Sequence, residues 1–130
     1  MDYSQLNSLA LAYLGDAVFE LEARKMLLNQ GLSKVNDLHK AAVRMVKATT
    51  QAKAMHCILP ELDELEAGVV RRGRNAKSGM VPKNTGVTEY RYATALEALV
   101  GYWYLTGNQA RIRRVFEVVT QLLQQETQAN

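Results

Sequence analysis

Apolar residues recur at every third or fourth position along most of the chain, the spacing that places them on one face of an α-helix. The first such run consists of Leu6, Leu9, Tyr13, Ala17 and Leu21. It predicts one long helix, with a break near Ser8, that reaches Asn29. Gly31 suits the position after this helix, because glycine adopts the left-handed conformation without steric cost.

Three shorter helices are predicted over the residues that follow. Ser33 is a suitable N-cap for the first, whose apolar face is formed by Val35, Leu38, Ala42, Met45 and Val46. The second covers Lys47 to Leu59 and ends before Pro60, because proline cannot donate the backbone hydrogen bond of a continuing helix. The third covers Glu61 to Arg71, with acids early and arginines late, the order that a helix dipole favours.

The helical pattern stops in the stretch RRGRNAKSGMVPKNTG, residues 71–86, which holds three glycines, one proline and two asparagines. This composition predicts a loop. The loop is long for a small helical domain, and long loops in compact domains tend to be functional or disordered.

Two further helices are predicted after this loop. Thr88 caps the first, which ends at Thr106–Gly107, and Asn108 caps the second. No segment shows the alternating pattern of a β-strand, so the predicted fold class is all-α. The chain has 130 residues, of which 48% are apolar, which suits a single domain, 1–130, with a hydrophobic core.

Composition narrows the function further. No apolar run approaches the ~20 residues of a membrane helix, and no basic region precedes the first apolar residues, so we expect neither a membrane span nor a signal peptide. Cys57 is the single cysteine, which suits a reducing cytoplasm. His39 and His56 lie far apart, and GRNAKSG lacks the spacing of a phosphate-binding P-loop, so neither a zinc site nor a nucleotide site is predicted.

The placement of the basic residues is more informative than the net charge of +3. No acid occurs between Glu66 and Glu89, an interval that contains Arg71, Arg72, Arg74, Lys77 and Lys83. The C-terminal part of the chain adds Arg111, Arg113 and Arg114. Clustered basic charge is typical of a surface that binds a polyanion. The alternative is a solvated loop and a solvated helix face, and charge alone does not decide between them.

Two acids stand in apolar helical surroundings. Asp16 lies in LAYLGDAVFE, next to Gly15, and Glu97 lies in YATALEALVGYWYL. Burial of an isolated carboxylate costs several kcal/mol, so each acid needs a cation, hydrogen bonds or a proton. Glu20, one helical turn after Asp16, could join them as a ligand of a hard divalent ion such as Mg²⁺. The alternative is that both acids form structural salt bridges or face water at helix edges. Gly15 would allow close helix packing beside Asp16.

The same two stretches resemble the paired motifs of the ribonuclease III family. LAYLGDAVFE resembles a motif that in most members is E-x-L-G-D-A-V, where x is aromatic, and ALEALVGYWYL resembles D-x-x-E-A-L-x-G. They occur in the right order, roughly eighty residues apart. We expect no double-stranded-RNA-binding domain to follow, and together with RRGRNAKSG…PKNT this resembles the Mini-ribonuclease III branch.

The resemblance implies a ribonuclease III-like helical bundle that hydrolyses double-stranded RNA with Mg²⁺, for which Mn²⁺ can substitute. It also implies a homodimer with one site per subunit, the two sites cutting opposite strands. Members of the branch trim large-subunit ribosomal RNA precursors in bacteria, so we expect precursor ribosomal RNA as the substrate. A ribosomal protein that presents this RNA is a further candidate partner.

Residue by residue, the resemblance implies that Asp16 and Glu97 are the catalytic acids and metal ligands, and that Tyr13 inserts into the partner subunit. Two acids of the wider family are missing, because Ala12 and Thr94 stand in their positions. We therefore expect one Mg²⁺ held by Asp16 and Glu97, with water in most other positions. Glu20 is an additional candidate, which the family motif does not include.

Duplex RNA is recognised through its shape, its phosphates and its 2′-hydroxyl groups. A basic, glycine-rich loop suits this task, because arginine and lysine contact phosphates and glycine lets the backbone approach closely. The residues expected to bind RNA are Arg71, Arg72, Arg74 and Lys77, with polar support from Asn75, Ser78, Lys83 and Asn84.

Two other functions are kept as alternatives. The first is a non-catalytic ribonuclease III-like domain that only binds structured RNA, which Ala12 and Thr94 make worth testing. The second is a helical protein-interaction module whose basic loop docks an acidic partner. Metal-dependent cleavage of duplex RNA would exclude the first, and affinity for duplex RNA would exclude the second.

Overall fold

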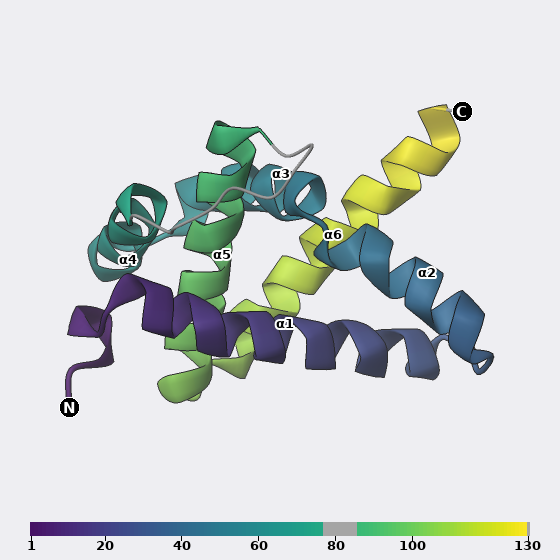
Figure 1. Cartoon of the computed structure of the whole chain (residues 1–130), viewed down its shortest axis with the longest axis horizontal. Coiled ribbons are helices and arrows are strands. Elements are labelled where there is room, and N and C mark those ends of the chain that lie inside the picture. Colours follow the sequence, from purple (N-terminus) through teal and green to yellow (C-terminus); the bar gives the residue numbers. More distant parts are fainter. Residues whose placement is uncertain (77–85, 130) are drawn as a thin grey trace.

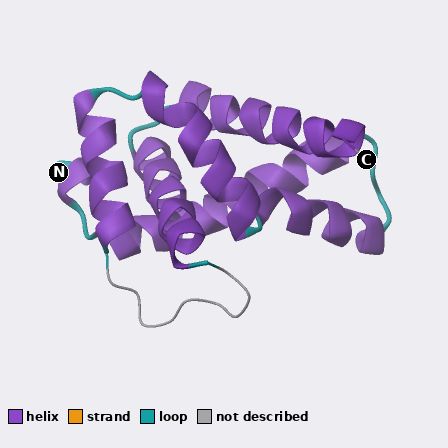
Figure 2. Ribbon diagram, turned by 90° about the horizontal axis from the view of Figure 1, so that it is seen from above, coloured by secondary structure: helices purple, strands orange, loops and turns teal. Residues whose placement is uncertain are grey.

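Helices account for nearly all of the chain that the computed structural model describes, namely residues 1–76 and 86–129 (Figure 1). The elements are, in order, a 3₁₀-helix at Tyr3–Gln5, α1 (Ser8–Asn29), α2 (Val35–Val46), α3 (Ala48–Ile58), a 3₁₀-helix at Leu59–Glu61, α4 (Glu64–Asn75), α5 (Val87–Leu105) and α6 (Gln109–Ala129). No strand occurs in these two ranges, and the predicted all-α fold class is confirmed. The described connections between helices are short (Figure 2). None of the described helices is long and apolar enough to cross a membrane.

The central helix of the fold is α5, which contacts α1, α3, α4 and α6. In Figure 1, α1 crosses α5, while α3 and α4 lie beside its N-terminal half. Leu96, Leu99 and Val100 follow one another closely in the sequence and are all completely buried. A helix that is apolar around most of its circumference is stable only when other helices surround it, because exposed apolar surface is unfavourable in water.

The backbones of α1 and α5 cross so closely that both helices need glycine. A Cβ atom added to Gly15 would overlap the backbone carbonyl group of Glu97, and one added to Gly101 would overlap that of Leu11. Neither glycine has a positive φ, so the requirement is for space and not for conformational freedom. The close packing predicted at Gly15 is confirmed.

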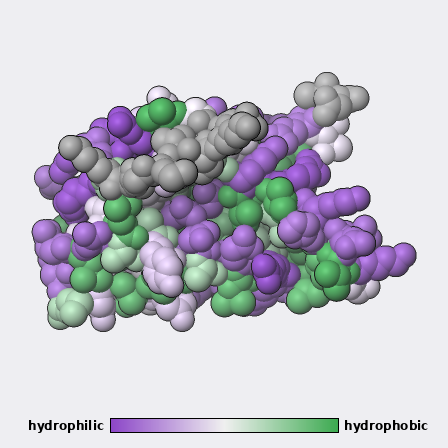
Figure 3. All heavy atoms as spheres, viewed as in Figure 1, coloured by the Kyte–Doolittle hydropathy of each residue, from purple (hydrophilic) through white to green (hydrophobic). Residues whose placement is uncertain are grey.

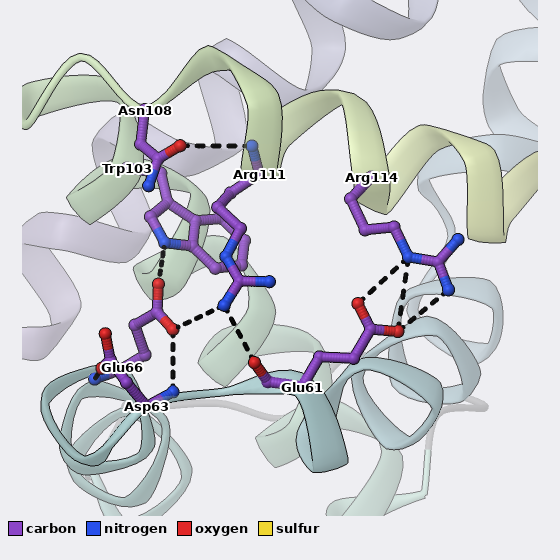
Figure 4. A network of polar contacts seen from close by, with 7 residues as sticks. All are labelled: Glu61, Asp63, Glu66, Trp103, Asn108, Arg111 and Arg114. Carbon is purple, nitrogen blue, oxygen red and sulfur yellow. Dashed lines mark hydrogen bonds and ion pairs between the residues drawn. The ribbon is translucent and has the colours of Figure 1, made fainter.

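A buried carboxylate connects α4 with α5 and α6 (Figure 4). Glu66 of α4 is only 4% exposed. It accepts hydrogen bonds from the indole nitrogen of Trp103 at 2.7 Å, the guanidinium of Arg111 at 3.1 Å and the backbone nitrogen of Asp63 at 3.0 Å. Every charge in this network has a partner, which is the condition under which burial of a carboxylate is tolerated.

This network also gives two of the C-terminal arginines a structural role. The guanidinium of Arg111 donates a second hydrogen bond, of 2.8 Å, to the backbone carbonyl of Glu61. The guanidinium of Arg114 lies 2.9 Å from the Glu61 carboxylate. Arg111 attaches α6 to the first turn of α4 through Glu66, and both arginines attach α6 to the preceding 3₁₀-helix through Glu61. These contacts explain the two arginines without a polyanion.

Several predicted helix ends are confirmed. Gly31 follows α1 with a φ of +95°, and the side chain of Asn108 accepts a hydrogen bond from the backbone nitrogen of Arg111 at the start of α6. Two predicted N-caps are wrong: α2 begins after Lys34 and not after Ser33, and α5 begins after Gly86 and not after Thr88.

The bounds predicted for α4 and for the loop after it were also partly wrong. The helix begins at Glu64 and not at Glu61, because Asp63 and Glu66 form a capping box. It continues to Asn75 and not only to Arg71, so residues 72–75, which the sequence assigns to the loop 71–86, are helical. Contacts with α5 account for the extension, since a Cβ atom on Gly73 would lie 3.0 Å from the Cα atom of Ala95. The remainder of that loop, residues 77–85, lies outside the described residues.

We predict that Gly15→Ala destabilises the protein by about 3 kcal/mol or more, because the helices must separate to make room for a methyl group. The measurement is urea unfolding followed by circular dichroism. The matched control is Gly68→Ala in α4, where the atoms nearest to an added Cβ are guanidinium nitrogens, of Arg72 at 3.3 Å and of Arg71 at 3.8 Å. This control should change stability by about 1 kcal/mol or less, with helix propensity favouring alanine. Similar losses in both variants would contradict the prediction.

Candidate active site

The crossing of α1 and α5 brings Asp16 and Glu97 together. Asp16 follows Gly15 directly, and the backbone of Glu97 lies against Gly15 on the facing helix. The two carboxyl groups lie within hydrogen-bonding reach of each other. Asp16 is exposed, whereas Glu97 is half-buried. Two residues that are far apart in the sequence therefore form one acidic pair that opens to solvent on the α1 side.

The environment of this pair strongly favours a neutral Glu97. The pKa of Glu97 is raised from 4.5 to about 8, first by burial and next by the adjacent carboxyl group of Asp16. Glu20 adds a smaller increase, while the side-chain amide of Gln51 opposes it. Like charges side by side and partly removed from water are unfavourable, so without a cation Glu97 carries a proton at neutral pH.

Gln51 of α3 was not among the predicted site residues. It is 3% exposed, and its side-chain amide lowers the pKa of Glu97. In the sequence, Gln51 stands in a helix whose neighbouring positions face the core, and this position indicates that Gln51 is buried. Only the packing of α3 against α5 shows that it acts on Glu97.

The structure also shows what stands in place of the two missing family acids. Ala12 and Thr94 are each 7% exposed. The Thr94 hydroxyl donates a 2.9 Å hydrogen bond to the backbone carbonyl of Tyr90, one turn back in α5. Glu20, the third candidate ligand, pairs with Arg24 on its own helix at 3.5 Å. Among the described residues, no three or more Asp, Glu, His or Cys side chains are grouped so that they could hold a metal ion.

The predicted RNA-binding residues within the described part of the chain lie on the last turns of α4. Arg71 and Asn75 are exposed. Arg72 donates a 2.6 Å hydrogen bond to the backbone carbonyl of Ser4 and thereby holds the N-terminal 3₁₀-helix. Arg74 bonds the Tyr92 hydroxyl at 3.3 Å. The other four predicted residues lie outside the described residues, and they are Lys77, Ser78, Lys83 and Asn84.

Tyr13, the predicted dimer contact, is 84% exposed on α1, one turn before Asp16 and Ala17. Leu21 on α1 and Val35 on α2 are also exposed large apolar residues. Apolar side chains, green in Figure 3, accordingly gather along the side of the molecule that carries α1. An open groove between α1 and α2 continues this surface and is lined mainly by leucine and valine side chains.

Comparison with known proteins agrees with this fold. Residues 9–108 match the family model of the ribonuclease III domain. A Mini-ribonuclease 3 of Desulfitobacterium hafniense is 56% identical over 124 residues, which cover 95% of this chain and 78% of that protein. A Mini-ribonuclease 3 of Symbiobacterium thermophilum is 47% identical, with 92% of each chain covered. A solved structure of a Fusobacterium nucleatum protein is similar with a TM-score of 0.84 at 34% identity, and covers 93% of this chain and 98% of that one.

The helical fold and these matches show that the chain belongs to the ribonuclease III family. Its relatives are Mini-ribonuclease 3 proteins that match it over most of its length, and they place it in that branch of the family. Membership supports an endoribonuclease, a hydrolase whose substrate is RNA. The resemblance found in the two sequence motifs is thus confirmed at the level of the family and the branch.

Proposed function

We propose that this chain is a Mg²⁺-dependent endoribonuclease that hydrolyses phosphodiester bonds in double-stranded RNA. The observation that carries the proposal is the pairing of Asp16 with Glu97 at the crossing of α1 and α5. The pair is open to solvent through Asp16 and backed by the core through Glu97. We further propose that it works in the cytoplasm on large-subunit ribosomal RNA precursors, which rests on the resemblance to the Mini-ribonuclease III branch.

The residues present fit a magnesium ion. The adjacent carboxyl group of Asp16 raises the pKa of Glu97, and a divalent cation held by the two acids would offset this unfavourable proximity. Mg²⁺ is commonly held by one or two carboxylates and otherwise by water and phosphate oxygens, so the lack of a third acidic ligand in the described residues does not exclude it. Asp16 and Glu97 would hold the ion, and Mn²⁺ would suit the same oxygens.

Each residue of the site has a distinct task in this proposal. When bound by Asp16 and Glu97, Mg²⁺ would supply an activated water and would stabilise charge on the scissile phosphate. Asp16 presents its carboxylate at the surface, where a phosphate group can approach. Glu97, whose pKa is raised, would give up its proton to hold the ion, and it is held in place by the buried residues around it in α5. Gly15 keeps the two carboxylates adjacent because it lets the helices touch.

We predict that Asp16→Asn and Glu97→Gln each lower the cleavage rate at least a hundredfold, since the charge stabilisation that the ion supplies is worth several kcal/mol. The measurement is a time course with Mg²⁺ on a duplex RNA, on one strand of the same sequence and on a large-subunit precursor transcript. Glu22→Gln, also on α1 but on another face, is the control and should cleave like the wild type. Equal cleavage by all four proteins would reject the catalytic assignment, and tight duplex binding without cleavage would indicate the non-catalytic RNA-binding alternative.

The end of α4 is the part of the proposed RNA-binding surface that the structure describes. Arg71 is exposed and free to reach a phosphate, whereas Arg72 already donates to Ser4. The four predicted residues beyond Ala76 are proposed to extend the same surface. Phosphate contacts of this kind position the duplex without reading its sequence.

Arg71→Gln should weaken binding of duplex RNA about equally for all sequences and reduce the slope of log affinity against log salt concentration by about 1. Arg72→Gln should instead lower the melting temperature, because the N-terminal 3₁₀-helix loses its anchor. Filter binding at a series of NaCl concentrations and thermal unfolding measure the two effects. An unchanged salt slope for Arg71→Gln would remove Arg71 from the RNA contact.

We also propose a homodimer that is formed through the exposed apolar surface of α1. Tyr13 and Leu21 on α1 and Val35 on α2 support this proposal, because all three are large apolar side chains that are exposed. Val35 also lines the apolar groove between α1 and α2, and apolar surface of this extent typically marks an interface. Two copies related by a two-fold axis would each place an acidic pair beside the shared surface, since Asp16 follows Tyr13 by one turn. Each site would then cut one strand of the duplex.

Tyr13→Glu is expected to shift the protein from the mass of two chains to that of one, because a charge would be buried in the interface. Sedimentation velocity measures this shift. Tyr104→Glu is the control, since Tyr104 is also an exposed tyrosine but lies at the far end of α5. Wild-type protein that sediments as a single chain at micromolar concentration would contradict the proposed dimer.

A further inference from the structure

Three side chains from α3, α4 and α5 meet in a cluster that is separate from the acidic pair. The imidazole of His56 on α3 lies against the ring of Tyr92 on α5, with the ring centroids 4.2 Å apart. The guanidinium of Arg74 on α4 lies 5.7 Å from the centroid of the same ring and donates a 3.3 Å hydrogen bond to the Tyr92 hydroxyl. We call His56, Arg74 and Tyr92 the tyrosine cluster, because the tyrosine contacts both of the other side chains.

The tyrosine cluster reaches the surface beside an open pocket. His56 and Tyr92 line this pocket, which lies between α3 and α5 and has a volume of about 290 Å³. His56 is exposed, whereas Arg74 and Tyr92 are half-buried. The face of an aromatic ring is electron-rich and attracts cations. Tyr92 therefore holds a guanidinium and an imidazole near the surface and supplies no carboxylate that would neutralise them.

Two further charged residues line the pocket, and each is already beside an opposite charge or dipole of the protein. Lys53 on α3 lies 3.7 Å from the carboxylate of Glu126 on α6. Glu89 lies in the first turn of α5, and a Cβ atom added to Gly86 would be 3.4 Å from one of its carboxylate oxygens. This carboxylate is therefore at the N-terminal end of α5, where the helix dipole stabilises an acid.

Arg74 and His56 consequently have donors to offer to an external anion. A guanidinium has five N–H donors, and the hydrogen bond from Arg74 to Tyr92 uses one of them. An imidazole changes its charge between pH 5 and 8 and has two N–H donors when it is protonated. Charged donors of this kind form their strong hydrogen bonds with phosphate and carboxylate oxygens.

We propose that the tyrosine cluster is a phosphate-binding site for duplex RNA, in which Arg74 and protonated His56 contact the RNA backbone. The proposal rests on the proposed function, because it takes duplex RNA as the substrate. Tyr92 precedes Glu97 by five residues on α5, which is about 7.5 Å along the helix axis. This separation is much smaller than one helical turn of a duplex, so an RNA held at the acidic pair is long enough to reach the cluster.

The proposal changes the expected extent and the pH dependence of RNA binding. The RNA-binding surface would extend from the end of α4 across α5 to His56 on α3. Protonation of His56 would add one phosphate contact, so RNA binding would become tighter as the pH falls. The charged neighbours of His56 are Lys53 on its own helix, Glu89 on α5 and, through the Tyr92 ring, Arg74 on α4.

The test is filter binding of a duplex RNA with Mg²⁺ at pH 5.5 and 8.0, over a series of NaCl concentrations. All proteins carry Glu97→Gln, which is expected to suppress cleavage and also removes a carboxyl group whose pKa is about 8. This parent protein should bind about fivefold tighter at pH 5.5 than at pH 8.0 in ~0.15 M salt, because one additional phosphate contact releases about one counterion. The slope of log affinity against log salt concentration should be steeper by about 1 at pH 5.5.

Two substitutions of His56 separate its charge from its packing. His56→Phe keeps an aromatic ring against Tyr92 but removes the charge, so the tighter binding at pH 5.5 should disappear. His56→Arg is charged at both pH values, and it should bind at pH 8.0 about as tightly as the parent binds at pH 5.5. Lys25→Gln is the control, since Lys25 is exposed on α1 and follows Asp16 by about two and a half turns, on the opposite face. It should keep the full effect of pH.

An effect of pH in His56→Phe equal to that in the parent would overturn the proposal, and so would parent affinity that does not change with pH. Failure of His56→Arg to bind more tightly than the parent at pH 8.0 would also contradict it. Arg74→Gln should reduce the salt slope by about 1 at both pH values, and an unchanged slope would remove Arg74 from the site. Circular dichroism checks that each variant is folded.

The outcome is separable from that of the proposed function. Wild-type protein that neither binds nor cuts duplex RNA at either pH would reject the nuclease proposal and the phosphate site with it. Cleavage by the wild type, together with an equal effect of pH in the parent and in His56→Phe, would reject the phosphate site and retain the nuclease.

Discussion

The backbones of α1 and α5 touch at Gly15 and Gly101, and the geometry of the acidic site depends on this contact. A helix normally keeps its neighbour at a distance set by side chains. Where both helices carry glycine, the separation falls to that of two backbones, and the side chains next to the crossing are forced together. Asp16 and Glu97 occupy those flanking positions, so the same packing that stabilises the core also places two carboxyl groups side by side.

That proximity has an electrostatic cost, which defines what the site can bind. Burial and the neighbouring carboxyl group both raise the pKa of Glu97. Elsewhere in the molecule the buried acid, Glu66, is neutralised by Arg111 and by hydrogen bonds, and it forms a permanent structural link. The same chain thus contains an acid that is paired with a cation and an acid that lies beside another acid. An acid supplied with internal partners is structural, whereas an acid placed beside another acid is left to be satisfied by a proton or by an external cation.

The basic residues divide in a similar way. Arg72, Arg111 and Arg114 make intramolecular contacts that hold helices or the N-terminal turn in place. Arg71 keeps its charge at the surface. Counting the arginines in the sequence therefore overestimates the polyanion-binding surface, because a guanidinium that already donates to protein oxygens has fewer donors to offer a phosphate. The proposed recognition of RNA rests on the residues that remain exposed.

The sequence by itself was sufficient to predict the all-α class, most of the helices, and Asp16 and Glu97 as the candidate site acids. These features depend on local periodicity and on short motifs. It also indicated close packing at Gly15. Only the tertiary structure decided the rest. The extension of α4 to Asn75 results from packing on α5, and the structural use of Arg72 and Arg111 results from oxygen atoms supplied by distant segments. The effect of Gln51 on the pKa of Glu97 depends on the packing of α3 against α5, two helices that the sequence does not relate. Local propensity acts over a few residues, whereas these contacts connect positions that become neighbours only when the helices pack.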